Sequence, residues 1–313
     1  MEKILIAEPN NFSPKALELI SKRFQVTERN ISENELLWAF DNFECFWFRL
    51  AFKIDKEILH SKKRKVIKII CPVTGLNHID TIECKKLGID VISLKGEYVF
   101  LKEIRATAEL TLALTLATLR KIPQSFESVK NFKWDRDDFK GNEIYNKKVG
   151  IIGYGRLGKI VAKYFQSFGA TILVYDKKRI NIKKYSVVKS LKELVARSDI
   201  ITLHVDYNSA SHSMMNASIF NNFKKGSIVI NTSRGEIIDN SALLNSLNKG
   251  TIMGAALDVI DNEYSINDHE LIQYSKNNAN LIITPHIGGN TEESFKKTEL
   301  FLAKKLLDSF EKE

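Results

Sequence analysis

The chain has 313 residues, of which 44% are hydrophobic and 27% are charged, a composition that favours a folded globular protein over a disordered or fibrous one. A single hydrophobic core rarely grows beyond about 250–300 residues, so this length predicts two domains. The formal charge of +9 is spread along the chain in short runs such as KKRK at 62–65, which favours a solvated surface attractive to small anions over a nucleic-acid groove.

Sequence features that bear on location point to the cytoplasm. The N-terminal stretch MEKILIAEP is interrupted by Glu8 too early for a signal peptide, and the longest apolar stretch, Ala106–Leu119, is too short for a membrane span. The three cysteines, Cys45, Cys71 and Cys84, show no C-x-x-C spacing and suit a reducing compartment. We therefore expect a cytoplasmic protein with no nucleic-acid or membrane partner.

In the first hundred residues, short apolar runs alternate with helical patterns, which predicts a parallel sheet covered by helices. Ser13 before Pro14 is a typical helix start, and SENE at 32–35 is a capping box. Asp80 opens another helix, which Gly88 can close in a left-handed conformation. The expected strands of this part are 3–8, 45–50, 66–71 and 89–94.

A second alternating series follows the apolar helix at Ala106–Leu119, and its six strands would complete a doubly wound domain. The last helical segment, 291–313, could return to the first domain. We therefore predict an α/β fold with two doubly wound parallel-sheet domains: a flavodoxin-like substrate and catalytic domain at 1–103 and 288–313, and a Rossmann NAD domain at 104–287. The expected strands of the second domain are 149–152, 171–176, 199–205, 226–232, 254–260 and 281–284. The 106–119 helix is apolar beyond one face, which suggests a homodimer.

The stretch GIIGYGRLG has the glycine spacing of a dinucleotide fingerprint, between an apolar strand and an amphipathic helix. Gly153 permits a tight turn, Gly155 lets a pyrophosphate approach the backbone, and Gly158 lets helix and strand pack closely. Arg156 and Leu157, between these glycines, open the helix whose N-terminus faces the phosphates. Asp176 follows Gly153 by 23 residues and would bind the adenosine ribose, which favours NAD over NADP. Against that preference, the basic run at 177–179 could hold a 2′-phosphate.

Three further motifs stand at predicted strand ends: NTSRGEIIDNSALLNSLNKG from residue 231, GAALDVIDNE from residue 254 and ITPHIGG from residue 283. In content and order they resemble the D-isomer-specific 2-hydroxyacid dehydrogenases, and TGLNHID with CKKLGIDV, at 74–91, extends the resemblance to nearly the whole chain. The resemblance implies an NAD-dependent, phosphoglycerate dehydrogenase-like enzyme. Such an enzyme transfers a hydride between NAD(H) and C2 of a small anionic 2-hydroxy or 2-oxo acid of D configuration, in the cleft between two domains.

The resemblance also implies the site residues. Arg234 would grip the carboxylate and carbonyl of a 2-oxo acid, His286 would protonate the carbonyl oxygen, and Glu263 would hydrogen-bond and orient the imidazole. The backbone amides of Thr74 and Gly75 would meet the substrate carboxylate. The positions that the resemblance places around the cofactor are Val205, Asp206, Thr232, Ser233, Asp258 and Gly288.

Several assignments have alternatives. The family usually follows its catalytic acid with proline, whereas Tyr264 follows Glu263 here, and Asp261 is a rival for the role. His204 and Asp206 stand two apart on a strand end without a third ligand at suitable spacing, so we expect no metal.

Residues 97–105 look like an extension relative to the family. Lys102 and Arg105 could reach a phosphate or second carboxylate of the substrate, and Glu97 a hydroxyl or amine; alternatively the segment only caps the cleft. Among aromatic residues, Tyr98, Phe100 and Trp134 are expected to serve packing.

Two other functions are open on the sequence alone. One is an NAD(H)-sensing binding protein similar to the corepressors built on this fold, although those usually carry interaction tails. The other is oxidation of another small anion, such as phosphite or formate. Formate enzymes resemble this family but carry an amide where Glu263 stands, which argues against formate.

Overall fold

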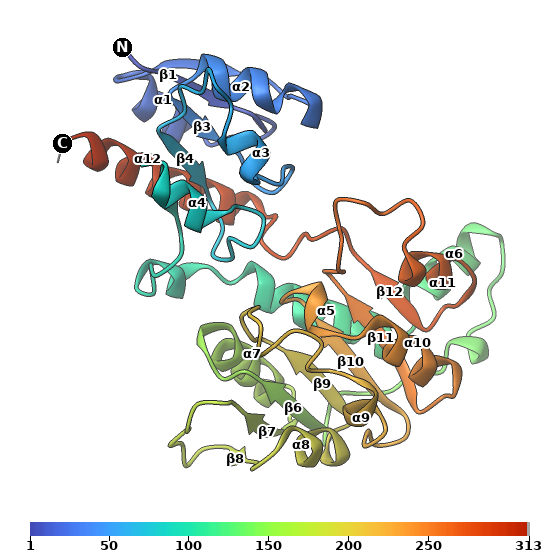
Figure 1. The fold of residues 1–313 in the computed structure, drawn as a ribbon. Helices are drawn as coiled ribbons and strands as arrows, with labels where there is room; N and C mark the ends of the chain where they lie inside the picture. The colour runs from blue at the N-terminus through green and yellow to red at the C-terminus, as the bar shows by residue number, and fades with distance from the viewer. Residues whose placement is uncertain (312–313) are drawn as a thin grey trace. The chain divides into compact units, whose positions relative to one another are not determined.

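The computed structural model describes residues 1–311, which form two compact units, each built on its own parallel sheet (Figure 1). The first unit comprises Met1–Ile104 and the chain from Asn290 onward, and the second comprises Arg105–Gly289. The second unit is therefore inserted into the sequence of the first. Both have the α/β architecture that the sequence predicts.

The sheet of the first unit has five parallel strands in the order β2-β1-β3-β4-β5. This is the flavodoxin-like order, in which the chain adds one strand beside β1 and then continues on its other side. Strand β2 is absent from the predicted strands, because no side chain of this edge strand is fully buried and it lacks an apolar run. The strands are β1 (Lys3–Ile6), β2 (Gln25–Glu28), β3 (Cys45–Trp47), β4 (Lys68–Cys71) and β5 (Asp90–Ser93).

The helices of the first unit begin at the predicted caps. The Ser13 side chain accepts the amide of Ala16, and Asp80 accepts the amide of Glu83. The predicted capping box at 32–35 is present, but it begins a short 3-10 helix (Glu33–Glu35) that leads into α2. The α-helices are α1 (Pro14–Ser21), α2 (Leu36–Asn42), α3 (Lys56–Leu59), α4 (Thr81–Lys86) and α12 (Glu292–Phe310).

The C-terminal helix α12 completes the core of the first unit. It packs against α1 and β5, and Leu302, Ala303 and Leu306 on its inner face are fully buried (Figure 1). Burial of the two leucines alone stabilises the unit by several kcal/mol, since each large aliphatic side chain contributes about 1.5–3 kcal/mol. The unit therefore depends on residues from both ends of the chain.

The segment 94–104, which contains the extension noted in the sequence, is fastened to α12. The rings of Phe100 and Phe301 stack with centroids 4.1 Å apart, and Lys305 pairs with Glu97 at 2.6 Å. Phe100 thus packs as expected, and Glu97 is engaged with protein. The packing role expected for Tyr98 is wrong, because its side chain points into solvent and is 73% exposed.

The sheet of the second unit has seven parallel strands in the order β12-β11-β10-β9-β6-β7-β8. This is the Rossmann order with one strand added, and the direction of winding changes between β6 and β9. Strand β8 is absent from the predicted strands, because it has only two residues and both side chains are exposed. The strands are β6 (Lys148–Ile152), β7 (Thr171–Tyr175), β8 (Ser186–Val187), β9 (Ile200–Leu203), β10 (Ser227–Asn231), β11 (Ile252–Leu257) and β12 (Leu281–Ile283).

Helices cover both faces of the second sheet and bury two apolar clusters. One cluster joins the sheet to α5 (Ala106–Leu119) and α7 (Arg156–Ser167). The other joins it to four helices: α8 (Leu191–Arg197), α9 (Ala217–Phe220), α10 (Asn240–Asn248) and α11 (Glu270–Asn277). Because both faces are covered, the central strands β9 and β10 are buried along their whole length and consist mainly of apolar residues.

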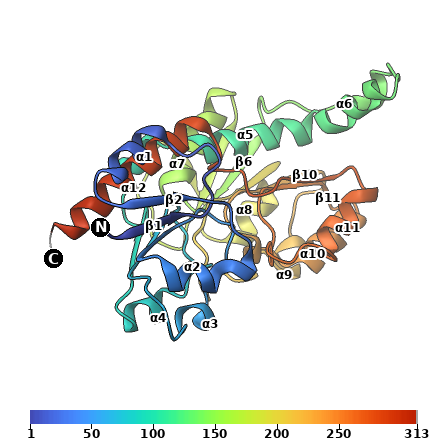
Figure 2. The same ribbon diagram turned by 90° about the horizontal axis from the view of Figure 1, so that it is seen from above.

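The segment 121–140, here called the arm, extends from the far end of α5 and contains α6 (Ile122–Lys130) (Figure 2). The packing role expected for Trp134 is wrong, because this side chain is 86% exposed on the arm. Among residues 1–311, no helix is both long enough and apolar enough to span a membrane.

Candidate active site

The turn between β6 and α7 carries the glycine fingerprint. Gly153 has φ +89°, and a Cβ there would collide with the carbonyl of His204. Gly158 lies against the carbonyl of Gly153, which brings α7 close to β6. Gly155 is different, because nothing among residues 1–311 lies within 4 Å of the position a Cβ would take. The open space at Gly155 fits the close approach of a pyrophosphate to the helix N-terminus.

Asp176 follows β7 and lies beside the same turn. Its carboxylate accepts the amides of Tyr154 and Lys178, both at 2.8 Å. Val205 follows β9 and also borders the turn, since its side chain would contact a Cβ at Gly153. Asp206 comes next on an exposed loop. The predicted ribose-binding acid and the fingerprint are thus at one edge of the sheet.

The two side chains between the fingerprint glycines differ in their surroundings. Leu157 packs against the apolar cluster under α7. Arg156 is the first residue of α7 and is half-buried. Burial lowers the pKa of Arg156, and the positive charge of Arg105 lowers it further. A bound anion would offset both effects.

The loop after β10 is fixed by a buried amide. Asn231 Oδ1 accepts the backbone N–H of Ser233 at 3.0 Å and its hydroxyl at 2.7 Å, and Asn231 Nδ2 donates to the carbonyl of Arg234 at 2.9 Å. A Cβ at Gly235 would collide with the backbone of Ile260. The loop that presents Arg234 therefore lies directly on the loop that follows β11.

Asp258, at the end of β11, holds the loop that follows β12. It is 1% exposed, and its Oδ1 accepts the Thr284 hydroxyl at 2.6 Å and the Ile287 amide at 2.8 Å. Its Oδ2 accepts the Gly288 amide at 2.7 Å. Burial raises the pKa of Asp258, while these hydrogen bonds oppose the shift by favouring the charged carboxylate.

His286 is at the centre of this loop in a left-handed conformation, with φ +53°. Its amide donates to the carbonyls of Asp258 and Thr284, both at 2.9 Å. Its Nδ1 lies 3.0 and 2.9 Å from the two carboxylate oxygens of Glu263. Within residues 1–311, Nε2 of the same ring has no hydrogen-bond partner. A non-glycine residue held at positive φ is typical of functional sites.

The rival carboxylate, Asp261, faces another histidine. Its Oδ1 lies 2.9 Å from His269 Nε2 and accepts Asn240 Nδ2 at 2.7 Å. The side chain of Glu263, and not that of Asp261, is therefore the one paired with His286.

Thr232 differs from its neighbours after β10, because its hydroxyl bonds to that of Thr111 on α5 at 2.8 Å. The Thr107 hydroxyl, also on α5, donates to the carbonyl of Gly288 at 3.0 Å. Helix α5 thus supports two of the positions implied for the nicotinamide end.

In the first unit, Thr74 and Gly75 belong to the loop after β4. The preceding residue, Val73, donates its amide to Cys71 at 2.8 Å. Within residues 1–311, the amides of Thr74 and Gly75 donate to no protein acceptor. These N–H groups are available to an anion.

His204 has the surroundings of a neutral residue. Burial lowers the pKa of His204 to about 3, and its Nε2 is 3.0 Å from the Thr202 hydroxyl. In the part of the chain that the structure describes, histidine, cysteine, aspartate and glutamate side chains form no group of three suited to a metal ion.

The predicted residues therefore fall into three groups. Arg234, Glu263 and His286 follow β10, β11 and β12, which are neighbouring parallel strands, so they share one edge of the sheet. The fingerprint, Asp176 and Val205 follow β6, β7 and β9 at the same edge. Thr74 and Gly75 belong to the first unit.

Sequence reasoning missed two positioning residues, Asn231 and Thr284. Asn231 is a fully buried polar residue in a strand of apolar side chains, and this contrast is a signal that the sequence does contain. Thr284 carries no comparable signal, because a threonine at a strand end is common.

Comparison with known proteins identifies the family. A model described as "D-isomer specific 2-hydroxyacid dehydrogenase, NAD binding domain" matches residues 112–288. A D-3-phosphoglycerate dehydrogenase of Archaeoglobus fulgidus is 33% identical over 98% of this chain, which spans 57% of that relative's length. A hydroxypyruvate reductase of Thermotoga maritima is 29% identical over 97% of this chain and 97% of its own length.

Solved structures agree with this relationship. The D-lactate dehydrogenase of Aquifex aeolicus, complexed with NAD and lactic acid, superposes with a TM-score of 0.81 at 29% identity, over 99% of this chain and 95% of that one. The TT0316 protein of Thermus thermophilus superposes with a TM-score of 0.85 at 27% identity, over 99% and 97% of the two chains. The family match covers more than half of the chain and the whole edge that carries His286, so this chain belongs to the D-isomer specific 2-hydroxyacid dehydrogenase family.

Proposed function

We propose that this protein transfers a hydride between NAD(H) and C2 of a small anionic 2-hydroxy or 2-oxo acid, with D configuration at C2. The observation that carries the proposal is the pair of His286 and Glu263, which leaves imidazole Nε2 without a partner among residues 1–311. Membership of the family supports the same reaction.

The proton chemistry follows from that pair. When bound, the nicotinamide donates a hydride to C2 or accepts one from it. In reduction, His286 gives its Nε2 proton to the carbonyl oxygen, so that hydride and proton together convert the 2-oxo acid to the 2-hydroxy acid. In oxidation, the neutral imidazole takes the hydroxyl proton. The Glu263 carboxylate accepts a hydrogen bond from Nδ1–H. This bond fixes the orientation of the ring and stabilises the positive charge of the protonated imidazole.

Substrate binding is assigned to cationic and backbone donors. We propose that the Arg234 guanidinium binds the carboxylate and the carbonyl in a fork, and that the amides of Thr74 and Gly75 bind the same carboxylate. The absence of other acceptors for these two amides within residues 1–311 supports the assignment. On this proposal, residues 1–103 and 288–313 form the substrate domain, and residues 104–287 form the cofactor domain.

For the cofactor we propose NAD, with NADP less favoured. The open space at Gly155 and the carboxylate of Asp176 beside the fingerprint support this choice. The residues proposed to hold it form four groups. They are Gly153, Gly155, Arg156, Leu157 and Gly158 at the pyrophosphate, Asp176 at the adenosine ribose, Val205 and Asp206 beneath the cofactor, and Thr232, Ser233, Asp258 and Gly288 at the nicotinamide end.

Removing the charge of Asp176 should relax the choice of cofactor. Asp176→Asn keeps an oxygen that can accept the Tyr154 amide but no longer repels a 2′-phosphate. We expect the ratio of kcat/KM for NADH to that for NADPH to fall about tenfold or more, since like charges in contact cost several kcal/mol. Steady-state kinetics with both cofactors measure this ratio, and an unchanged ratio would remove Asp176 from the ribose site.

The proposed function is tested by NADH oxidation with a panel of unbranched 2-oxo acids, followed by chiral analysis of the product. Turnover of any of them excludes a purely NAD(H)-sensing role. Absence of turnover across the panel, together with NADH binding, would refute the proposed reaction and favour that role.

We also propose that the protein is a homodimer, in which α5 and the arm meet a second copy. Three threonines of α5 turn their hydroxyls back to its own carbonyls, and Glu109 is the one charged residue of this helix, so little of its surface is polar. On the arm, Phe132 is 100% and Trp134 86% exposed, with further apolar side chains beside them. Monomeric proteins rarely expose such a set, and a second copy would cover it.

Substitution on the arm should weaken the dimer. Burying one large apolar side chain contributes about 1.5–3 kcal/mol, so Phe132→Ser with Trp134→Ser should raise the dimer dissociation constant about 100-fold or more. Sedimentation velocity over a dilution series measures the constant. Val187→Ser, at an exposed apolar position on β8, is the matched control. A wild-type protein that stays monomeric at every concentration would contradict the proposal.

A further inference from the structure

The proposed chemistry uses the carboxyl edge of the first sheet after β4, but it leaves the switch point of that sheet unused. In open parallel sheets, ligands bind outside the carboxyl ends of the strands where the winding reverses. Here the reversal is between β1 and β3. Glu8 follows β1 and Arg49 follows β3, so charged residues of opposite sign stand at this switch point.

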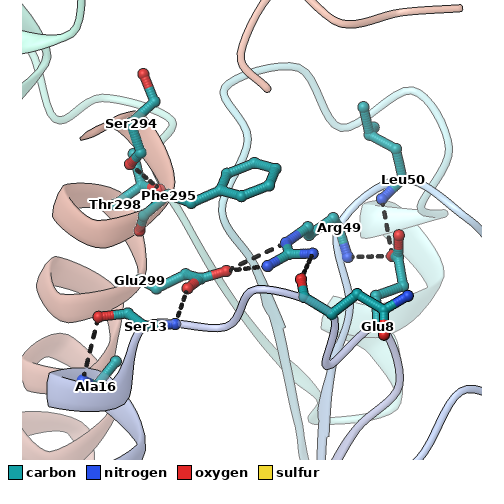
Figure 3. Close-up of polar contacts among 10 residues, drawn as sticks. Glu8, Ser13, Ala16, Arg49, Leu50, Ser294, Phe295, Thr298 and Glu299 are labelled. Atoms are coloured by element: carbon teal, nitrogen blue, oxygen red, sulfur yellow. Dashed lines mark hydrogen bonds and ion pairs between the residues drawn. The ribbon is translucent and has the colours of Figure 1, made fainter. Parts of the chain in front are cut away.

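Helix α12 brings a second carboxylate to the same place (Figure 3). Glu299 is 0% exposed, and its Oε1 accepts Arg49 Nε at 3.1 Å and Nη2 at 2.7 Å. Its Oε2 accepts the amide of Ser13 at 2.7 Å. Burial raises the pKa of Glu299, while the bonds from Arg49 and Ser13 oppose that shift; both oxygens act as acceptors, which is the pattern of an ionised carboxylate.

The guanidinium of Arg49 uses its hydrogen-bond donors on protein groups. Its Nη1 donates to the carbonyl of Asn10 at 3.0 Å, and the ring of Phe295 lies under the guanidinium at 4.0 Å (Figure 3). All three of its nitrogens therefore have protein partners, and the side chain is 13% exposed. Because the Arg49 guanidinium binds Glu299 through two nitrogens, it does not bind a substrate anion in the same way.

Glu8 fills the neighbouring anion site. Three successive amides, those of Arg49, Leu50 and Ala51, converge on Glu8 Oε2 at 2.5, 3.1 and 3.2 Å. Such a nest of amides usually receives a ligand anion, but here the chain supplies its own. Two carboxylates and one guanidinium leave the group formed by Glu8, Arg49 and Glu299 with a net charge of −1.

The charged residues that follow Arg49 on its own loop leave this formal charge unchanged. Lys53 and Asp55 carry opposite formal charges, and the Asp55 carboxylate caps α3. Lys102 lies on the segment after β5, which is two strands away from β3 in the sheet. By contrast, the free amides proposed for the substrate carboxylate follow β4, the direct neighbour of β3. The remainder of a substrate bound there would be next to the negative group.

We propose that this edge selects 2-oxo acids whose only anionic group is the C1 carboxylate, and discriminates against substrates that carry a phosphate or a second carboxylate. The inference rests on the proposed function and names its substrate class. It separates this protein from the D-3-phosphoglycerate dehydrogenases among its relatives and places it with reductases of small unphosphorylated 2-oxo acids.

The direct test compares hydroxypyruvate with 3-phosphohydroxypyruvate, which differ only in the phosphate. We expect kcat/KM for hydroxypyruvate to be about tenfold higher or more, and the ratio to shrink as ionic strength rises. Equal or better use of the phosphorylated compound would overturn the inference while leaving the proposed function intact. Failure of both compounds, and of glyoxylate and pyruvate, would instead refute the proposed function and the inference with it.

Variants that remove one charge test whether the negative group causes the discrimination against 3-phosphohydroxypyruvate. Glu8→Gln retains an oxygen for the three amides, which use Oε2 alone, and takes the group from −1 to neutral. We expect relative use of 3-phosphohydroxypyruvate to rise about tenfold. Glu299→Gln should act in the same direction, with circular dichroism to verify folding of this buried substitution. Glu18→Gln removes an exposed charge from α1 and should leave the ratio unchanged. A ratio that stays the same in Glu8→Gln and in a folded Glu299→Gln would refute the electrostatic cause.

Discussion

Replacing His286 with alanine is expected to lower kcat for 2-oxo acid reduction by about 10²–10⁴-fold, the usual contribution of a positioned general acid. The imidazole is the group whose Nε2 is unoccupied within residues 1–311, and its removal leaves the carbonyl oxygen to take a proton from water. NADH binding should persist, because the fingerprint and Asp176 follow other strands. Single-turnover kinetics and NADH fluorescence titration measure the two effects separately.

Two companion variants sharpen this test. Glu263→Gln removes the charge that faces Nδ1 and loosens the orientation of the ring, so it should lower kcat less than His286→Ala. His212→Ala removes an exposed imidazole on another loop and should leave kcat unchanged. Turnover that survives in His286→Ala would mean that another group donates the proton.

Arg234→Ala should weaken substrate binding and turnover together. Truncating one partner of a buried hydrogen-bonded charge pair costs roughly 2–5 kcal/mol, which corresponds to a loss of about 30- to 5,000-fold in kcat/KM. The loss should be divided between a higher KM and a lower kcat, because the fork is proposed to hold both the carboxylate and the carbonyl. Steady-state kinetics with one 2-oxo acid at saturating NADH measure both constants.

The geometry of the fork can be separated from its charge. Arg234→Lys keeps the positive charge but loses the bidentate arrangement, so it should recover only part of the lost activity. Arg197→Ala, at an exposed position on α8, is the matched control. An unchanged KM in Arg234→Ala would contradict the carboxylate grip.

The sequence predicted those features that depend on local pattern. Gly158 lies against the carbonyl of Gly153 within the same turn, and Ser13 and Asp80 cap helices within three residues of themselves. The strands β2 and β8 were not predicted, because exposed strands need no apolar run. Local rules are sufficient where the partners are close in the chain.

Contacts between residues far apart in the sequence could not be predicted from such local rules. Nothing near Glu299 in the sequence indicates that its partner is Arg49, 250 residues away. The same applies to Asp258, whose implied place near the cofactor gave no sign that its carboxylate holds the loop around His286. The residue types were informative, but their pairing depends on how the strands are ordered in the sheets.

The insertion of the second unit into the first has a consequence for synthesis on the ribosome. Arg49 emerges 250 residues before Glu299, and at roughly 5–20 residues per second this interval lasts about 12–50 s. During that time the first sheet lacks α12, and the apolar surface that Leu302 and Leu306 will cover stays exposed. The second unit is continuous in sequence and can fold before α12 has been synthesised. The nascent first unit is therefore the part of this protein with the greatest need of a chaperone.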